Sequence, residues 1–377
     1  MQTPLEVLPA AAPVVQRPLE ALLATGSVVI LDGALATELE RRGADLFDPL
    51  WSAKILIEQP ELIRAVHLDY FKAGADVATT ATYQATFEAF QRRGIDRDAA
   101  AQLMRDAVRL AMEAREEFWA VPANRAGRAR PLVAASIGPY GAMLADGSEY
   151  RGHYAQSDGQ LRDFHRPRFE VLARSGADLL AFETIPCLRE ALVLARLLEE
   201  FPSMSAWISF SCQDGSRNCE GEDVGACASA LQPYSQIAAI GLNCTRPEFV
   251  EPLLRRMREH TGKPLLAYPN SGENYDAAAK VWRGNPHLQP FADQARSWYD
   301  AGARLLGGCC RTTPQDIKAI HATYGVVHTN PRDGSPGSML GKIRLAFLEE
   351  RAHSLDAILG FEGHLLGAAL RPKLLLQ

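Results

Sequence analysis

The sequence lacks any hydrophobic run as long as the roughly 18 apolar residues that suggest a membrane-spanning helix. It also lacks a strong excess of charge of one sign: the formal net charge is −5 at pH 7, which favours neither nucleic acid nor an anionic membrane surface. Residues 1–18 are rich in proline and alanine but have no basic start of the signal-peptide type. We therefore expect a cytoplasmic globular protein that binds neither nucleic acid nor membranes, with residues 1–18 as a flexible lead-in.

Several familiar catalytic motifs are absent. The nine histidines form no H-E-x-x-H pair, and there is neither a G-x-S-x-G elbow nor a P-loop. Serine hydrolase and nucleotide phosphotransfer activities therefore have little support. The chain has only seven cysteines, without the spacing of a disulfide scaffold, so most of them are expected to be free thiols in a reducing cytosol.

What is present is an alternation of short apolar runs with longer segments of helical periodicity. Segments 60–72 and 98–118 have apolar residues at helical spacing. This alternation predicts parallel strands and an α/β fold, a (β/α)₈ TIM barrel over residues 19–325. A doubly wound open sheet is the alternative, but the first run lacks the glycine-rich phosphate loop that it would favour. The eight predicted strands are 28–32, 76–80, 132–136, 178–183, 206–211, 237–242, 264–269 and 304–308.

A weak internal repeat supports the same fold. The stretches around Gly74, Gly176 and Gly302 share the form of a helix end, a glycine and a following strand. Each glycine is expected in the left-handed conformation that ends a helix. Beyond the barrel, residues 326–339 have the composition of a linker and 340–377 that of a helical C-terminal extension, which would pack on the barrel or form a homo-oligomer contact.

Three cysteines follow two of the predicted strands. Cys244 ends G-L-N-C, while Cys309 and Cys310 end G-G-C-C. In a barrel the strand ends surround one mouth, so three thiolates there would hold Zn²⁺ and leave its fourth position open. Two alternatives stay open: buried free thiols, or a thiol–disulfide oxidoreductase that uses Cys309 and Cys310.

Two acidic residues and a tyrosine belong to the same predicted mouth. Asp32 and Glu183 end the first and fourth strands. A buried carboxylate needs a partner, and this would be a backbone amide, an arginine or the ammonium group of an amino-acid substrate. Tyr83, with Tyr140 and Tyr150, would either line a pocket for a cationic group or simply pack in the interior.

Taken in order, six motifs resemble the homocysteine S-methyltransferase family over about residues 20–325, in particular the branch that uses S-methylmethionine and often S-adenosylmethionine. Each motif alone is weak, but the ordered set is specific. The motifs are D-G-A-L-A-T-E from Asp32, G-P-Y-G from Gly138, F-E-T from Phe182, G-L-N-C from Gly241, Y-P-N-S-G-E from Tyr268 and G-G-C-C-R-T-T-P from Gly307.

The resemblance implies a TIM barrel that holds one zinc ion through Cys244, Cys309 and Cys310. It implies that Asp32 and Glu183 bind the amino group of homocysteine, and it places Asn270 near the metal. The expected partners are homocysteine and a sulfonium methyl donor, with methionine as the product. Betaine as methyl donor is the alternative within the fold, because a pocket that accepts a cation would serve either donor.

Overall fold

The computed structural model describes residues 17–46, 52–276, 281–283 and 289–325, all of which fall in the first of two compact units, Met1–Val327. The predicted linker 326–339 and helical extension 340–377 lie outside the described residues, as do residues 1–16. Those boundaries, and an oligomer formed through the extension, stay predictions. Within the described residues, no helix combines the length and the apolar character needed to cross a membrane.

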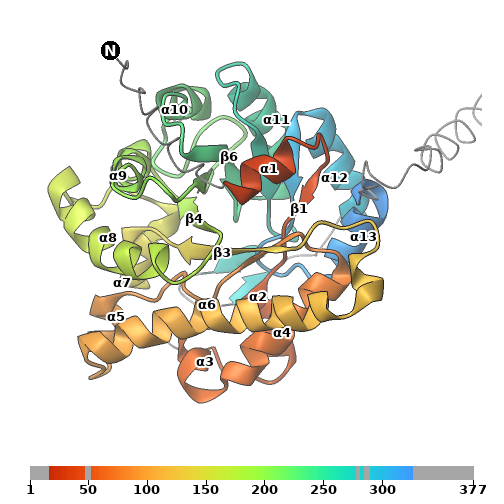
Figure 1. Ribbon diagram of the computed structural model, residues 1–377. Helices are drawn as coiled ribbons and strands as arrows, with labels where there is room; N and C mark the ends of the chain where they lie inside the picture. The colour runs from red at the N-terminus through yellow and green to blue at the C-terminus, as the bar shows by residue number, and fades with distance from the viewer. Residues whose placement is uncertain (1–16, 47–51, 277–280, 284–288, 326–377) are drawn as a thin grey trace, which may run out of the picture. The chain divides into compact units, whose positions relative to one another are not determined.

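Eight parallel strands form the barrel at the centre of the molecule (Figure 1). Their order in the sheet is β1-β10-β7-β6-β5-β4-β3-β2, and a parallel bridge between Leu31 and Val77 joins the two ends. The predicted (β/α)₈ fold and all eight predicted strand positions are confirmed. The strands are β1 (Val29–Ile30), β2 (Val77–Thr79), β3 (Leu132–Ile137), β4 (Leu179–Ile185), β5 (Ala206–Phe210), β6 (Ile237–Asn243), β7 (Leu265–Tyr268) and β10 (Ala303–Leu306).

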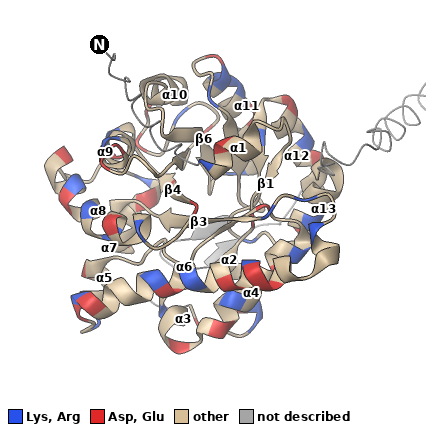
Figure 2. Ribbon diagram, viewed as in Figure 1, with Lys and Arg blue, Asp and Glu red and all other residues tan. Residues whose placement is uncertain are grey.

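Helices surround this barrel, and many of them carry charged residues of both signs (Figures 1 and 2). The glycine prediction is confirmed, since Gly74, Gly176 and Gly302 have φ angles of 114°, 93° and 112°. The main helices are α2 (Leu35–Arg41), α3 (Ser52–Glu58), α4 (Pro60–Ala73), α5 (Phe87–Gln91), α6 (Arg97–Ala120), α7 (Tyr140–Leu144), α8 (Asp158–Ala173), α9 (Leu188–Leu198), α10 (Val224–Leu231), α11 (Pro247–Arg258), α12 (Phe291–Asp300) and α13 (Pro314–Tyr324).

A hairpin and a short helix lie outside the predicted alternation of strands and helices. A hairpin of β8 (Asn274–Asp276) and β9 (Val281–Arg283) follows β7. Helix α1 (Pro18–Leu23) precedes β1 and buries two leucines in an apolar cluster formed by strand residues. Its Glu20 accepts a hydrogen bond from Ser205, just before β5, so α1 lies at the N-terminal end of the barrel. Helix α1 therefore does not cover the C-terminal end of the barrel, where barrel enzymes bind their substrates.

The backbones of β6 and β7 approach so closely at Gly241 that no side chain fits there. A Cβ atom at this position would lie 1.8 Å from the carbonyl oxygen of Leu266. We expect Gly241→Ala to lower the free energy of unfolding by about 3 kcal/mol, as forced overpacking does, in urea unfolding experiments. Gly262→Ala is the matched control, because nothing lies within 4 Å of the added atom. Equal stability of the two variants would contradict the prediction.

Candidate active site

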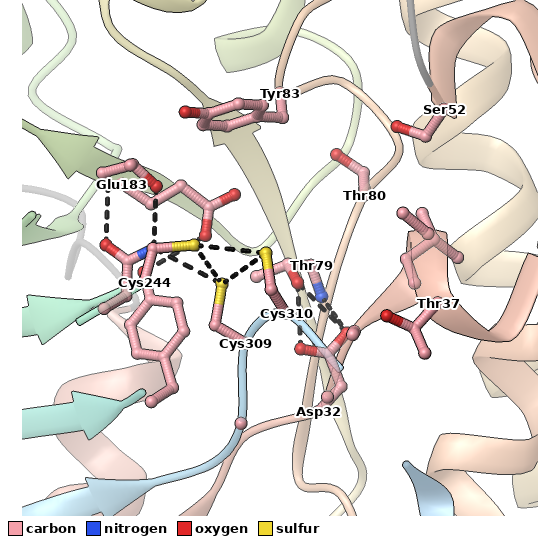
Figure 3. Close-up of a pocket in the computed structure, with 18 of the residues that line it drawn as sticks. Asp32, Thr37, Ser52, Thr79, Thr80, Tyr83, Glu183, Cys244, Cys309 and Cys310 are labelled. Atoms are coloured by element: carbon pink, nitrogen blue, oxygen red, sulfur yellow. Dashed lines mark hydrogen bonds between the residues drawn. The ribbon is translucent and has the colours of Figure 1, made fainter. Parts of the chain in front are cut away.

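The C-terminal ends of β6 and β10 bring three thiols together (Figure 3). Cys244 Sγ lies 2.8 Å from Cys309 Sγ and 3.4 Å from Cys310 Sγ, and the latter two sulfurs are 4.0 Å apart. All seven cysteines of the chain are free thiols. Cys309 and Cys310 follow Cys244 by 65 and 66 residues in the chain, and the structure brings all three together as the sequence predicted.

The local backbone explains how neighbouring cysteines reach the same place. Cys244 has a left-handed φ of 46°, which turns its side chain back from the end of β6. The Cys309 N–H donates to the carbonyl of Pro269 after β7, at 2.8 Å. Position 308, just before this turn, requires glycine, because a Cβ atom there would lie 2.3 Å from the hydroxyl oxygen of Thr312. That hydroxyl itself donates to the carbonyl of Cys309 at 2.7 Å, so the turn is tightly fixed.

The three thiols fit a tetrahedral metal. Three thiolates about 2.3 Å from one zinc ion would have their sulfurs roughly 3.8 Å apart. The separations of 2.8, 3.4 and 4.0 Å lie around this value, and small side-chain rotations would equalise them. Among the described residues, this cluster of candidate ligands contains no fourth histidine, cysteine or carboxylate. A metal held here would keep one position for a ligand from the cavity.

Hydrogen bonds make Cys244 the most acidic of the three thiols. Cys309 and then Cys310 donate to it and hold its pKa well below the usual range, and the same contact with Cys244 raises the pKa of each donor. The hydroxyl of Tyr150 lies 3.5 Å from Cys244 Sγ and also donates to it. The thiolate form that a metal requires is thus already stabilised in the cluster.

Asp32 is one of two buried carboxyl groups in this mouth. Its oxygens accept hydrogen bonds from Thr79, at 2.8 Å from the backbone N–H and 2.9 Å from the hydroxyl. Burial raises its pKa to about 8 in spite of these contacts. Of the three partners that the sequence allowed for Asp32, the structure therefore shows a backbone amide, that of Thr79. Among the described residues, no arginine or lysine forms an ion pair with it.

Glu183 is the second buried carboxyl group. It accepts hydrogen bonds from the hydroxyl of Ser136 and, at 3.1 Å, from the hydroxyl of Tyr268. Burial raises its pKa to about 7. Both of its hydrogen-bond partners are neutral hydroxyls, and the charge of the Cys244 sulfur also raises its pKa, so a cationic ligand would favour the charged carboxylate.

The cavity at these strand ends combines acidic side chains with a largely apolar wall. Six of the seven site residues predicted from the sequence line it: the three cysteines, Asp32, Glu183 and Tyr83. No lysine, arginine or histidine is among its described lining residues. Figure 3 shows Tyr83 and Asp32 on different sides of the cavity, with the sulfurs between them. Further lining residues include Thr37, Glu40, Ser52, Thr79, Thr80, Tyr150, Thr184, Asn243 and Tyr268.

Asn270 is the predicted site residue that does not line this cavity. It is 8% exposed, and its backbone N–H donates to the carbonyl of Thr245 at 3.0 Å. Its side-chain oxygen is buried without a hydrogen-bond partner. A role as a neighbour of the metal is therefore an untested prediction. Tyr140 also lies outside the lining, whereas Tyr150 belongs to it.

Asn243 was not assigned a role from the sequence. Its Oδ1 accepts hydrogen bonds from the N–H of Thr184 at 2.7 Å and the hydroxyl of Ser209 at 2.8 Å. Its Nδ2 lies 3.8 Å from the sulfur of Cys309. Thr184 has a φ of 59° directly after Glu183, so this amide supports a strained backbone that carries a site carboxylate. The only signal in the sequence was its place before Cys244.

Fold and site together define a (β/α)₈-barrel protein with a thiol cluster at its C-terminal mouth. The family model for homocysteine S-methyltransferases matches residues 29–324. The chain belongs to this family, as the sequence motifs indicated.

Curated relatives and a solved structure agree with this assignment. Homocysteine S-methyltransferase YbgG of Bacillus subtilis is 53% identical over 305 residues, covering 81% of this chain and 97% of the relative. A selenocysteine Se-methyltransferase of Brassica oleracea is 47% identical, with 80% and 90% covered. The metallated form of the homocysteine methyltransferase MmuM from Escherichia coli is 46% identical with a TM-score of 0.73, covering 81% of this chain and 99% of that one.

Proposed function

We propose that this chain transfers a methyl group from a sulfonium donor, S-methylmethionine or S-adenosylmethionine, to the sulfur of homocysteine and so forms methionine. The observation that carries the proposal is the convergence of three thiols and two buried carboxyl groups, whose hydrogen-bond partners are all neutral, in one cavity. Family membership supports the methyltransferase class and homocysteine as the acceptor. The sulfonium donor is what the resemblance of the sequence motifs implies, and the zinc ion is inferred from the three thiols.

Cys244, Cys309 and Cys310 would hold Zn²⁺, which suits thiolate ligands. Zinc at this position would favour loss of the homocysteine thiol proton at neutral pH and so supply the nucleophile. The metallated MmuM structure is consistent with a metal at these cysteines. We infer that the metal is zinc from the three thiolate ligands.

The protein's own residues would bind and align the reactants. Asp32 and Glu183 would accept the ammonium group of homocysteine, which places the amino acid relative to the thiols. Tyr83 and Tyr150 would cover the reacting atoms and exclude water, so that much of the acceleration comes from alignment. The bond from sulfonium sulfur to methyl breaks as the new sulfur–methyl bond forms. The leaving sulfur keeps the electron pair and departs as a neutral thioether, so no general acid is required.

The charge of the cavity favours a cationic donor. Its described lining contains the carboxyl groups of Asp32, Glu40 and Glu183 and no basic side chain. A bound sulfonium would favour the charged forms of these carboxyl groups, whereas an anionic donor would be repelled by them. Betaine carries a cation as well, but the curated relatives reported above are named for homocysteine and selenocysteine methyl transfer, which does not favour the betaine alternative. The oxidoreductase alternative is weakened by the third thiol, which serves a metal better than a disulfide pair.

Two further points belong to the proposal. The name of the selenocysteine Se-methyltransferase relative makes selenium-containing acceptors reasonable substrates, because a selenol is the heavier analogue of the same nucleophile. A cytoplasmic location fits the seven free cysteines, since thiols persist in reducing compartments.

A donor comparison tests the proposed reaction. With homocysteine as acceptor, we expect turnover with S-methylmethionine or S-adenosylmethionine to exceed turnover with betaine by about 100-fold, because only the sulfonium carries a strongly activated methyl group next to a good leaving group. A parallel series with a chelator should lose the activity, and added zinc should restore it. Faster turnover with betaine would refute the sulfonium donor, and full activity of metal-free protein would refute the role of the cluster.

A further inference from the structure

A group of ionisable side chains behind the cavity wall is fully buried, although the proposed reaction does not use it. We define Glu190, His165 and Arg168 as the buried clamp, with exposed fractions of 0%, 0% and 1%. His165 Nε2 lies 2.7 Å from Glu190 Oε1, and His165 Nδ1 lies 2.8 Å from Arg168 Nη2. Buried charges are costly, so a set of this kind requires an explanation beyond packing.

The protonation pattern of the clamp follows from these contacts. Arg168 has no acceptor atoms, so it must donate to Nδ1, and the imidazole then donates from Nε2 to the carboxylate of Glu190. Burial, with the charge of Arg168 as a second cause, lowers the pKa of His165 to about 4, which agrees with a neutral ring. The clamp is thus a carboxylate and a guanidinium joined through a neutral imidazole.

Both ends of the clamp bind one short turn. Glu190 Oε1 accepts a hydrogen bond from the N–H of Tyr140 at 2.7 Å, and Arg168 donates to the carbonyl of Gly138. These two groups flank Pro139, which has no N–H of its own. The turn from Gly138 to Tyr140, which follows strand β3, is therefore held at both ends by a single charge-neutral unit.

This turn contacts the cavity wall directly. A Cβ atom at Gly138 would lie 2.7 Å from the Cδ2 and Cε2 ring atoms of Tyr83 and 2.7 Å from its carbonyl oxygen. Gly138 thus supports both the ring and the backbone of Tyr83, which lines the cavity (Figure 3). A displacement of the turn would be transmitted to this tyrosine, because no gap separates them.

We propose that the buried clamp is a positioning device for the tyrosine wall of the cavity, and that it sets how the methyl donor is aligned. This proposal rests on the proposed function only because methyl transfer is the activity by which it is measured. The clamp touches no substrate; it acts through Gly138 on Tyr83, whereas the carboxylates that would bind homocysteine are held by other partners, Thr79 for Asp32 and Ser136 for Glu183.

The test is a double-mutant cycle between His165→Phe and Tyr83→Ala. We expect His165→Phe to lower kcat/KM for the methyl donor by about tenfold. This is less than the roughly 10²-fold that a 1 Å misplacement can cost, because the turn would shift only in part. Metal content and the affinity for methionine should stay unchanged. In the Tyr83→Ala background the same substitution should cause no further loss. His165→Gln should restore part of the activity, because its amide can both donate and accept.

Arg166→Gln is the matched control, since this half-exposed neighbour on α8 forms its described ion pairs with Glu170 and Glu200 and does not belong to the clamp. If His165→Phe does not yield folded protein, Tyr154→Phe takes its place in the cycle, because it removes one hydrogen bond to Glu190. Additive losses in either cycle would overturn the proposal and leave the clamp a purely structural element. The cycle uses whichever donor the wild type accepts, so inactivity with sulfonium donors would refute the proposed function separately.

Discussion

Cys310→Ala is expected to abolish both metal binding and methyl transfer. The substitution leaves two thiolates, and the cluster offers no other histidine, cysteine or carboxylate among the described residues to replace the third. Changes to groups that only support a metal ligand cost 10–100-fold in affinity or activity, so loss of a ligand should cost more than about 100-fold. Metal analysis of the purified protein should change from about one zinc per chain to almost none, and turnover with homocysteine should fall in parallel.

The matched control is Cys227→Ala. Cys227 is also a buried free thiol, but it lies in α10, where its sulfur contacts the amide of Asn218 instead of the cluster. This variant should keep its zinc and most of its activity. If Cys310→Ala retained full turnover, the thiol cluster would not be the catalytic centre. If Cys227→Ala lost zinc as completely as Cys310→Ala, the loss would reflect general destabilisation.

The site was accessible from the sequence because of barrel geometry. Parallel strands all end at one mouth, so Cys244 and Cys309 could be placed together although they are 65 residues apart. The same argument brought Asp32 and Glu183 to the cavity. It placed these four residues because each lies in or just beyond the end of a strand, where the fold largely sets the position.

The features that were missed depend on contacts without a local sequence pattern. Helix α1 is short, and its position follows from the apolar cluster at the barrel end, which periodicity does not reveal. Asn243 supports Thr184 through a hydrogen bond across 59 residues. The pairing of His165 with Glu190 joins two helices, and each residue alone is typical of a helix surface. Asn270 illustrates the converse: it follows a strand, yet it lies outside the cavity lining.

Asp32→Asn is expected to weaken the binding of the amino-acid substrate by roughly 100-fold, or about 2.7 kcal/mol, as loss of one member of a buried charge pair does. Asparagine keeps the shape, and its side-chain oxygen can still accept the hydrogen bond from the Thr79 N–H, but it cannot form an ion pair with an ammonium group. Calorimetry with methionine measures this effect separately from the metal, because methionine has the amino group without a thiol proton. Asp106→Asn, which removes a surface carboxylate of α6, should leave the affinity unchanged.

The same carboxyl groups predict a pH dependence of this binding. In the free protein the pKa values of Asp32 and Glu183 are raised to about 8 and 7, so at pH 6 both groups are largely protonated. An ammonium ligand favours their charged forms, and binding therefore releases protons. The dissociation constant for methionine should fall by at least about tenfold from pH 6 to pH 8, and this slope should be reduced in Asp32→Asn. A pH-independent affinity in the wild type would mean that these carboxyl groups do not bind the amino group.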